Sequence, residues 1–235
     1  RDSITAVRRQ LKEVCPPSLY NLTELQKDAS CLYGLTAGQT GDIAQSLYEK
    51  KLISYPRTAG RHISRDVYDM LPAVMEKMLA WRDLRPYMHP TGPDTSRLPG
   101  HVIGDDDLME NPAITVTGVR PEGLDRQEMQ VYTLIVGRMM EAFMPPCRVE
   151  CTTVEAVCAA RTFRMQACRI LDKGWNAVFG RENAVLPQGF TMLELPALSI
   201  GDTLPVSACN LVRKKDLPAN PFTDAELIGY MAVSY

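Results

Sequence analysis

The chain has no long apolar run. No stretch of its 235 residues approaches the roughly 18 consecutive apolar residues of a membrane span. The opening residues, RDSITAVRRQLKE, lack the apolar core of a signal peptide. We therefore expect a cytoplasmic protein with no membrane partner. The chain also lacks an initiator Met and ends within the pattern AELIGYMAVSY, so we expect a piece of a longer protein.

Metal-binding cysteine patterns are also missing. The seven cysteines form no CxxC pair and no Cys/His cluster of zinc spacing, and an odd number cannot all be paired. We expect reduced thiols. Cys147 and Cys151 are separated by three residues, but no second pair accompanies them, so they are interpreted as small buried residues and no metal site is predicted.

A large excess of charge of one sign is absent. The formal net charge is -2 and the pI is near 6.0, which argues against a protein that coats nucleic acid by bulk electrostatics. Residues 1–61, however, carry nine Lys/Arg against six Asp/Glu. This local excess fits either solvated faces or a basic groove.

What is present indicates a folded chain with helices first and strands later. Apolar residues make up 45% of it, and its length suits two modest units. Apolar spacing predicts helices over residues 22–33, ending at Gly34, and over residues 40–51, where Ile43, Ala44, Leu47 and Tyr48 face inward.

Three further helices are predicted from their caps. Ser64 begins a helix that Pro72 should kink or end, and Asp125 with Glu128 opens a long amphipathic one that stops before Pro145. Thr223 caps a last helix within residues 222–231. The proline-rich stretch from residue 85 to 123 is expected to be irregular.

In the second half of the chain, the helical spacing of apolar residues gives way to a strand-like pattern. Segments 148–157, 162–171, 190–195 and 203–212 are rich in β-branched residues and separated by Gly and Pro, which predicts antiparallel strands. Helices followed by strands indicate an α+β fold with separate units.

The segment LYEKKLISYPRT, residues 47–58, carries the most informative chemistry. A tyrosine hydroxyl is a poor nucleophile at its ordinary pKa of about 10, so a catalytic Tyr55 needs a nearby cation. Arg57 offers a fork that matches two phosphate oxygens, and Pro56 restrains the backbone between them. Taken alone, a tyrosine at a strand end is more typical of a core or an interface.

The wider pattern resembles the type IA DNA topoisomerases, in particular their topoisomerase III branch. The blocks that carry the resemblance are PPSLYNLTELQKDAS, TGDIAQSLYEKKLISYPRTAGRHIS, ITVTGVRPEGLDRQEMQVYTLIVGRMMEAF and ILDKGWNAVFG. They stand in the family's order and cover essentially the whole chain. The resemblance implies a bacterial enzyme that cleaves and rejoins single-stranded DNA through a 5'-phosphotyrosyl intermediate, without ATP, and so allows strand passage.

The resemblance also assigns residues. It implies that Tyr55 is the nucleophile and Arg57 the contact to the scissile phosphate, and that Gln45 and Glu49 line the site, unless they belong to a solvated helix face. Lys51, Arg61 and Arg65 are candidate phosphate contacts by charge, although each also suits an ordinary surface.

Two departures from the family qualify these expectations. The family's histidine motif falls on Asn111-Pro112-Ala113-Ile114, so its histidine is absent, and His101 would replace it only if its loop folded back. The acidic run at residues 105–107 is interpreted as a solvated loop, because three consecutive side chains do not converge easily on one ion. The second departure is that we expect this chain to carry neither the family's N-terminal Toprim domain nor its later winged-helix-like domain.

The family also implies a division of the chain. Residues 1–21 would form the first segment of a β arch, residues 22–145 a helical gate domain that carries the tyrosine, residues 146–215 the antiparallel arch, and residues 216–235 the start of a further helical domain. Mg²⁺ would be held by the Toprim domain of the full-length enzyme and not by this chain. We expect a monomer whose partners are single-stranded DNA and the rest of its own polypeptide.

Two other functions remain open on the sequence alone. A gate-like module that binds single-stranded DNA but has lost cleavage would be consistent with the missing histidine. An unrelated helical interaction domain is the third interpretation, and it would not bind oligonucleotides in a salt-dependent way.

Overall fold

The structure, a computed structural model, describes residues 3–81, 100–104, 111–180, 185–203, 205 and 222–233. The chain divides into two compact units. One comprises residues 1–15, 146–176 and 180–220, and the other comprises residues 16–145, 177–179 and 221–235. The first is built on a sheet and the second on helices, so the predicted α+β class is confirmed.

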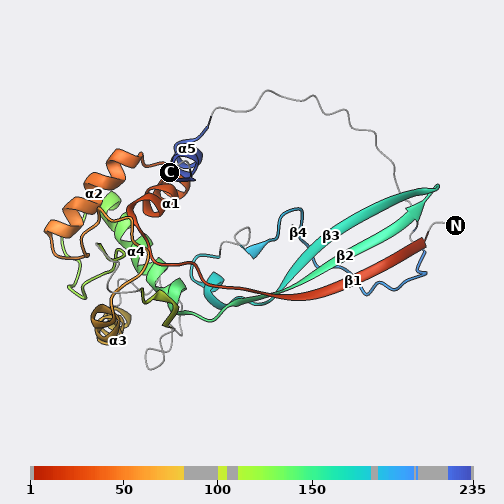
Figure 1. Cartoon of the computed structure of the whole chain (residues 1–235), viewed down its shortest axis with the longest axis horizontal. Helices are drawn as coiled ribbons and strands as arrows, with labels where there is room; N and C mark the ends of the chain where they lie inside the picture. The colour runs from red at the N-terminus through yellow and green to blue at the C-terminus, as the bar shows by residue number, and fades with distance from the viewer. Residues whose placement is uncertain are drawn as a thin grey trace. The chain divides into compact units, whose positions relative to one another are not determined.

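The sheet unit has four strands in the order β1-β2-β3-β4. Its three long strands are β1 (Ser3–Val14), β2 (Cys147–Cys158) and β3 (Arg161–Asp172), which pair antiparallel along their whole lengths (Figure 1). β2 and β3 were predicted to within a residue at each end. Apolar periodicity predicted no strand over residues 3–14, whose exposed middle is rich in charged side chains, although the family resemblance implied that residues 1–21 belong to a β arch.

The fourth strand differs from its prediction. Only Thr191–Met192 of segment 190–195 forms a strand, β4, and it pairs parallel with β3 at Ala167 and Cys168. The prediction of a longer antiparallel strand here was wrong. Residues 203 and 205 are not in a strand, and the rest of the predicted strand 203–212 lies outside the described residues.

Two cysteines of the sheet unit are joined. Cys151 and Cys168 stand directly opposite each other in the β2–β3 register, with their Cα atoms 4.3 Å apart, and form a disulfide. The expectation of reduced thiols was therefore wrong for this pair, because spacing along the sequence does not reveal which side chains meet across a sheet. Among the described residues, Cys15, Cys31 and Cys147 are free.

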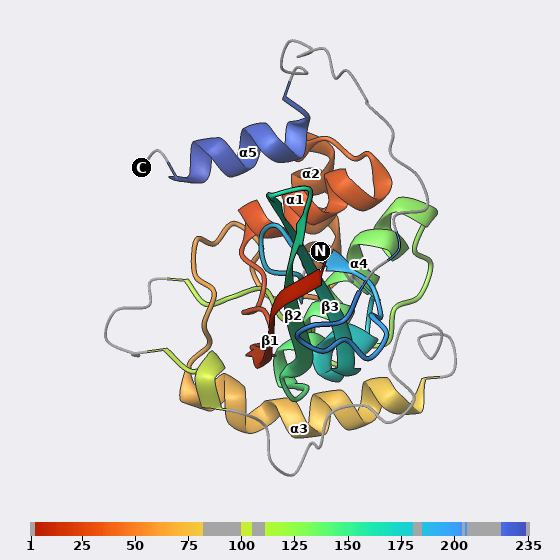
Figure 2. The ribbon, with the colours of Figure 1, turned by 90° about the vertical axis from the view of Figure 1, so that its right-hand side faces the viewer.

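The helical unit contains five α-helices, α1 (Leu22–Tyr33), α2 (Ala37–Glu49), α3 (Arg65–Ala80), α4 (Arg126–Phe143) and α5 (Asp224–Val233), among the residues described (Figure 2). The predicted caps at Gly34, Ser64 and Asp125 are present. α2 starts earlier than predicted because Thr36 and Gln39 form a capping box. Pro72 lies inside α3 without ending it.

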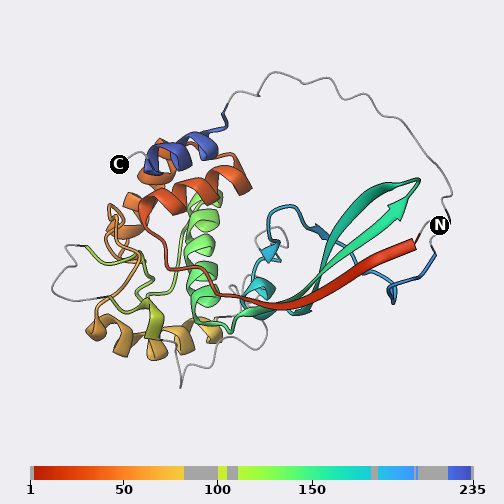
Figure 3. The same ribbon diagram turned by 45° about the vertical axis from the view of Figure 1, so that its right-hand side comes forward.

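The core of this unit surrounds α4. Every residue from Val131 to Met144 is buried, and both α1 and α2 pack against this helix (Figure 3). A helix buried on all sides is normally apolar all round, yet α4 carries Arg138. Its guanidinium donates to Asp28 Oδ2 at 2.8 Å and to Ser18 O at 3.2 Å, pairs with Glu141 at 3.2 Å, and lies 4.2 Å from the ring centroid of Tyr20. These contacts offset the cost of burying the charge.

Candidate active site

Tyr55 lies on a short segment that follows α2. Leu52 and Ile53 are buried, and Ile53 forms an antiparallel bridge with Val116. Two residues further on, the ring of Tyr55 is 43% exposed. Buried residues before it thus anchor the chain, while the phenol itself remains accessible from solvent.

The chain turns sharply between α2 and this segment. Lys51 has a φ of 62°, in the left-handed region that is uncommon for a residue other than glycine. Thr117 secures the turn, because its hydroxyl donates to Lys51 O at 2.6 Å and its amide donates to Leu52 O at 3.1 Å. The side chain of Lys51 is exposed, as a phosphate contact requires.

The ring of Tyr55 packs edge to face against Tyr48 from the last turns of α2. The ring centroids are 5.6 Å apart and the planes meet at 78°. Tyr48 was predicted to face inward, but it is 40% exposed and contacts Tyr55 instead, so that prediction was wrong. An aromatic pair of this geometry restricts the positions of the Tyr55 ring.

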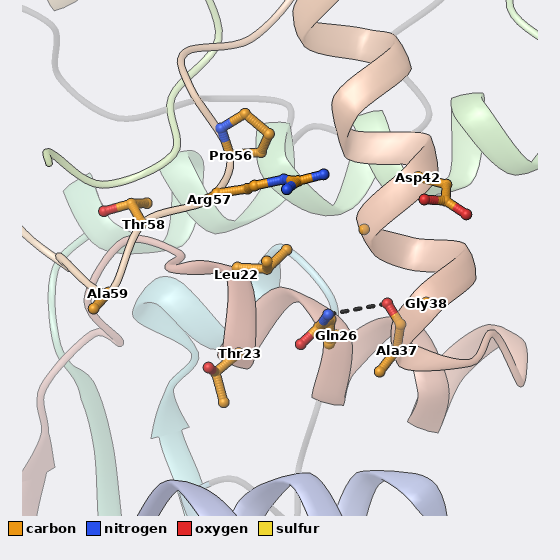
Figure 4. Close-up of a pocket in the computed structure, with 11 residues that line it drawn as sticks. Leu22, Thr23, Gln26, Ala37, Gly38, Asp42, Pro56, Arg57, Thr58 and Ala59 are labelled. Atoms are coloured by element: carbon orange, nitrogen blue, oxygen red, sulfur yellow. Dashed lines mark hydrogen bonds between the residues drawn. The ribbon is translucent and has the colours of Figure 1, made fainter.

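Arg57 borders a pocket of about 500 Å³. Its walls come from α1, from the first half of α2 and from the tyrosine segment, namely Leu22, Thr23, Gln26, Ala37, Gly38, Gly41, Asp42, Pro56, Arg57, Thr58 and Ala59. Figure 4 shows the Arg57 side chain reaching from its segment toward α2. Within the part of the chain that the structure describes, no hydrogen bond or ion pair engages this guanidinium. It is therefore free to bind an anion.

Gln26 forms part of the same pocket and was not predicted as a site residue. Its Nε2 donates to Ala37 O at 2.9 Å, which ties α1 to the start of α2 (Figure 4). The motif LTELQ, which carries part of the family resemblance, ends at this residue.

The other predicted contacts lie in different settings. Gln45 Nε2 donates to Glu49 Oε1 at 3.0 Å along α2, so these two side chains stand together on the helix that bears Tyr48. Arg65 is engaged elsewhere, since its Nε lies 3.1 Å from Asp69 Oδ1 and its guanidinium lies 5.3 Å from the ring centroid of Tyr68.

Arg61 is half-buried, and its Nε has no hydrogen-bond acceptor among the described residues. The role of all these predicted contacts in DNA binding stays a prediction.

The structure also describes Asn111, at the position of the family's histidine motif, and His101, the candidate replacement. The backbone oxygen of Asn111 accepts a hydrogen bond from Thr58 Oγ1 at 2.8 Å. His101 lies in a short 3-10 helix, Gly100–Val102, and the residues after it run beside Ile63, with Ile63 N donating to Val102 O at 2.9 Å. Burial, and then the proximity of His62, lower the pKa of His101. The predicted acidic run at 105–107 lies outside the described residues.

No helix in the described part of the chain is long and apolar enough to cross a bilayer. No three His, Cys, Asp or Glu side chains in the described ranges gather as metal ligands would.

An exposed Tyr55 and an Arg57 that has no partner among the described residues therefore stand on one anchored segment, a combination that DNA topoisomerases would need. The sequence profile of that family matches residues 2–234, so the chain belongs to it, and the resemblance to the type IA, topoisomerase III-like branch is confirmed. The chain is 30% identical over 234 residues to DNA topoisomerase 3 of Staphylococcus aureus strain USA300, covering 97% of this chain and 31% of that protein. For DNA topoisomerase 3 of Bacillus licheniformis the identity is also 30%, over 97% of this chain and 32% of the relative.

A solved structure shows the same fold. Full-length topoisomerase I from Thermotoga maritima matches with a TM-score of 0.63 and 16% identity, covering 99% of this chain and 37% of that one. The chain thus spans about a third of the length of the proteins it matches.

Proposed function

We propose that this chain supplies the nucleophile of a type IA topoisomerase that cleaves and rejoins single-stranded DNA. The observation that carries the proposal is that one anchored segment bears both an accessible Tyr55 and Arg57, whose guanidinium has no partner in the part of the chain that the structure describes. Membership of the family supports the substrate class.

In the proposed reaction the Tyr55 hydroxyl oxygen attacks the phosphorus of a DNA phosphodiester. A tyrosine–phosphorus bond forms, the bond from phosphorus to the 3' oxygen breaks, and the proton lost by the phenol is balanced by the proton that the 3' hydroxyl gains. Arg57 donates to the non-bridging oxygens, where negative charge grows in the transition state. One phosphoester bond replaces another, so resealing is the same step reversed and needs no ATP.

Replacement of Tyr55 by phenylalanine tests the nucleophile. In the full-length protein that carries this chain, we expect Tyr55→Phe to abolish the covalent DNA adduct, because only the attacking oxygen is removed. Affinity for single-stranded DNA should stay within about twofold, since stacking and charge are retained. Adduct trapping on denaturing gels and fluorescence anisotropy measure the two quantities.

Tyr33→Phe is the matched control, because Tyr33 is an exposed tyrosine at the end of α1, outside the tyrosine segment. A Tyr55→Phe enzyme that still relaxes supercoiled DNA would refute the assignment.

The finer organisation is proposed along with the chemistry. The helical unit would act as the gate that carries the tyrosine, and the sheet unit as part of the arch that moves it, as in the predicted division at residues 22–145 and 146–215. Mg²⁺, which in this family is held by a Toprim domain, would stabilise phosphate charge in the full-length enzyme.

A second candidate is a module that binds single-stranded DNA without cleaving it. Asn111-Pro112 in place of the family's histidine favours it. The same experiment separates the two: a wild-type enzyme that binds single strands in a salt-dependent way but never forms an adduct fits the binding module.

A further inference from the structure

The segment that replaces the family's histidine motif is joined to the tyrosine segment by two side-chain hydroxyls. Ser54 immediately precedes Tyr55, and Thr58 follows it by three residues. Both are at least half-buried. Each hydroxyl donates to one backbone oxygen of residues 111–115 and accepts one backbone N–H.

Ser54 makes the first of these links. Its hydroxyl donates to Ala113 O at 3.2 Å and accepts from Thr115 N at 2.9 Å. Its backbone N–H adds a third bond, to Thr115 O at 2.8 Å. Three hydrogen bonds therefore fix the residue from which the Tyr55 backbone continues.

Thr58 makes the second link. Its hydroxyl donates to Asn111 O at 2.8 Å and accepts from Gly60 N at 2.9 Å, and its own carbonyl accepts from Leu22 N at 3.2 Å at the start of α1. Thr58 is 5% exposed, so these bonds are largely shielded from water.

Close packing at Gly60 supports the same arrangement. A Cβ added there would overlap the backbone oxygen of Asn111, which is the atom that Thr58 binds. Only glycine allows the two segments to approach this closely. The hydroxyls of Ser54 and Thr58, together with the lack of a side chain at Gly60, thus maintain the contact between the tyrosine segment and residues 111–115.

We propose that Ser54 and Thr58 are positioning residues for Tyr55. Residues 111–115, which stand where the family has its histidine motif, contribute by holding these two hydroxyls with backbone atoms and not through a histidine side chain. We call this set of contacts the hydroxyl clamp. The inference rests on the proposed function. The clamp holds the backbone on both sides of the nucleophile, so loosening it displaces the phenol relative to Arg57 and slows attack, while DNA binding persists.

The test compares hydroxyl removal with hydroxyl retention in the full-length protein. Ser54→Ala and Thr58→Val should each lower the rate of adduct formation at saturating oligonucleotide about tenfold or more, with the dissociation constant for the oligonucleotide within about twofold. Ser54→Thr and Thr58→Ser keep the hydroxyl and should restore the rate to within about twofold. Rescue by these variants assigns the loss of rate to the hydroxyl itself and not to a change in side-chain volume.

Thr133→Val is the matched control. Thr133 is a buried hydroxyl of the same unit, bound to Gln130 O at 2.9 Å, and its loss should leave the adduct rate unchanged. Hydrogen exchange of the Thr115 and Gly60 amides gives a readout independent of chemistry, since Ser54→Ala should expose the first amide and Thr58→Val the second.

The outcomes separate the clamp from the proposed function. A wild-type enzyme that forms no adduct refutes the function, whereas amide protection still reports whether the hydroxyl contacts exist. If wild type forms the adduct and both hydroxyl-deletion variants match its rate, the clamp has no positioning role. Should Ser54→Ala fail to fold, the nearly isosteric Thr58→Val decides alone.

Discussion

At the scale of single residues, Arg57 shows how the site is prepared for an anion. Arg138 is engaged in a buried network with Asp28 and Glu141. Arg57 instead borders the pocket, and its guanidinium has no partner among the described residues. A charged group that contributes no internal contact costs the fold little to keep and is available for a ligand.

Substitution of Arg57 should therefore affect chemistry more than stability. We expect Arg57→Ala to slow adduct formation about 100-fold, as removal of one preorganised donor typically does. Affinity for single strands should fall only a few-fold, with a shallower salt dependence because one phosphate contact is lost. Rapid-quench measurement of the adduct and salt titration of binding provide the data.

Lys77→Ala on α3 removes one exposed positive charge away from the pocket and serves as control. Equal losses in the two variants would mean that net charge, and not the Arg57 fork, is responsible.

At the scale of elements, Glu128 ties the end of α2 to the start of α4. Its carboxylate accepts from Lys50 Nζ at 2.6 and 2.7 Å and from Ser46 Oγ at 2.7 Å, and it completes the capping box with Asp125. The hydrogen bond from Lys50, followed by that from Ser46, lowers the pKa of Glu128 below its ordinary 4.5. α2 leads directly into the tyrosine segment, so this contact also supports the site.

The pH dependence follows from the direction of that shift. Because the folded-state pKa is lower than the unfolded one, the stabilisation is complete above the unfolded pKa and is lost as pH falls through the folded pKa. We expect Glu128→Gln to lower the free energy of unfolding by roughly 2 kcal/mol at neutral pH, since charge-assisted hydrogen bonds are lost. The difference in the free energy of unfolding between Glu128→Gln and wild type should become smaller below pH 4.5.

Urea unfolding across this pH range measures the effect, and Glu122→Gln, at an exposed position, should change little. A difference between Glu128→Gln and wild type that does not vary with pH would contradict the argument.

Elements with strong local signals were the ones that the sequence predicted well. Caps at Ser64 and Asp125 and the apolar period of α4 are determined within a few residues, so they were found. Apolar periodicity did not predict β1, because a strand stabilised by pairing with distant residues needs little apolar alternation of its own.

In the site, too, residues with a local sequence signal were predicted and contacts between distant residues were not. Tyr55 and Arg57 were identified from a contiguous motif, whereas the hydroxyl clamp joins residues more than fifty positions apart. The contact of Tyr48 with Tyr55 depends on the left-handed turn at Lys51, which helical periodicity does not predict.

At the scale of the whole molecule, the chain spans about 31% of the length of its topoisomerase 3 relatives. We expect the 235-residue chain alone not to relax supercoiled plasmid in the presence of Mg²⁺, because the family resemblance implies that the Mg²⁺ ligands belong to a Toprim domain. Addition of a separately produced Toprim half should restore a 5'-phosphotyrosyl adduct on a single-stranded oligonucleotide.

Gel assays of plasmid topology and of labelled oligonucleotide test both statements, with the Tyr55→Phe chain as the negative control. Turnover by the chain alone would overturn the dependence on a second domain.

The register of β1 with β2 has a consequence for how the molecule assembles. Val14 pairs with Cys147, so helices α1 to α4 are an insertion between two adjacent strands. Formation of this residue pair closes a loop of residues 15–146. Closing a disordered loop of that length is entropically expensive and slow. Prior folding of the inserted helices shortens the effective loop, so the timing of sheet formation depends on residues that the sheet does not contain.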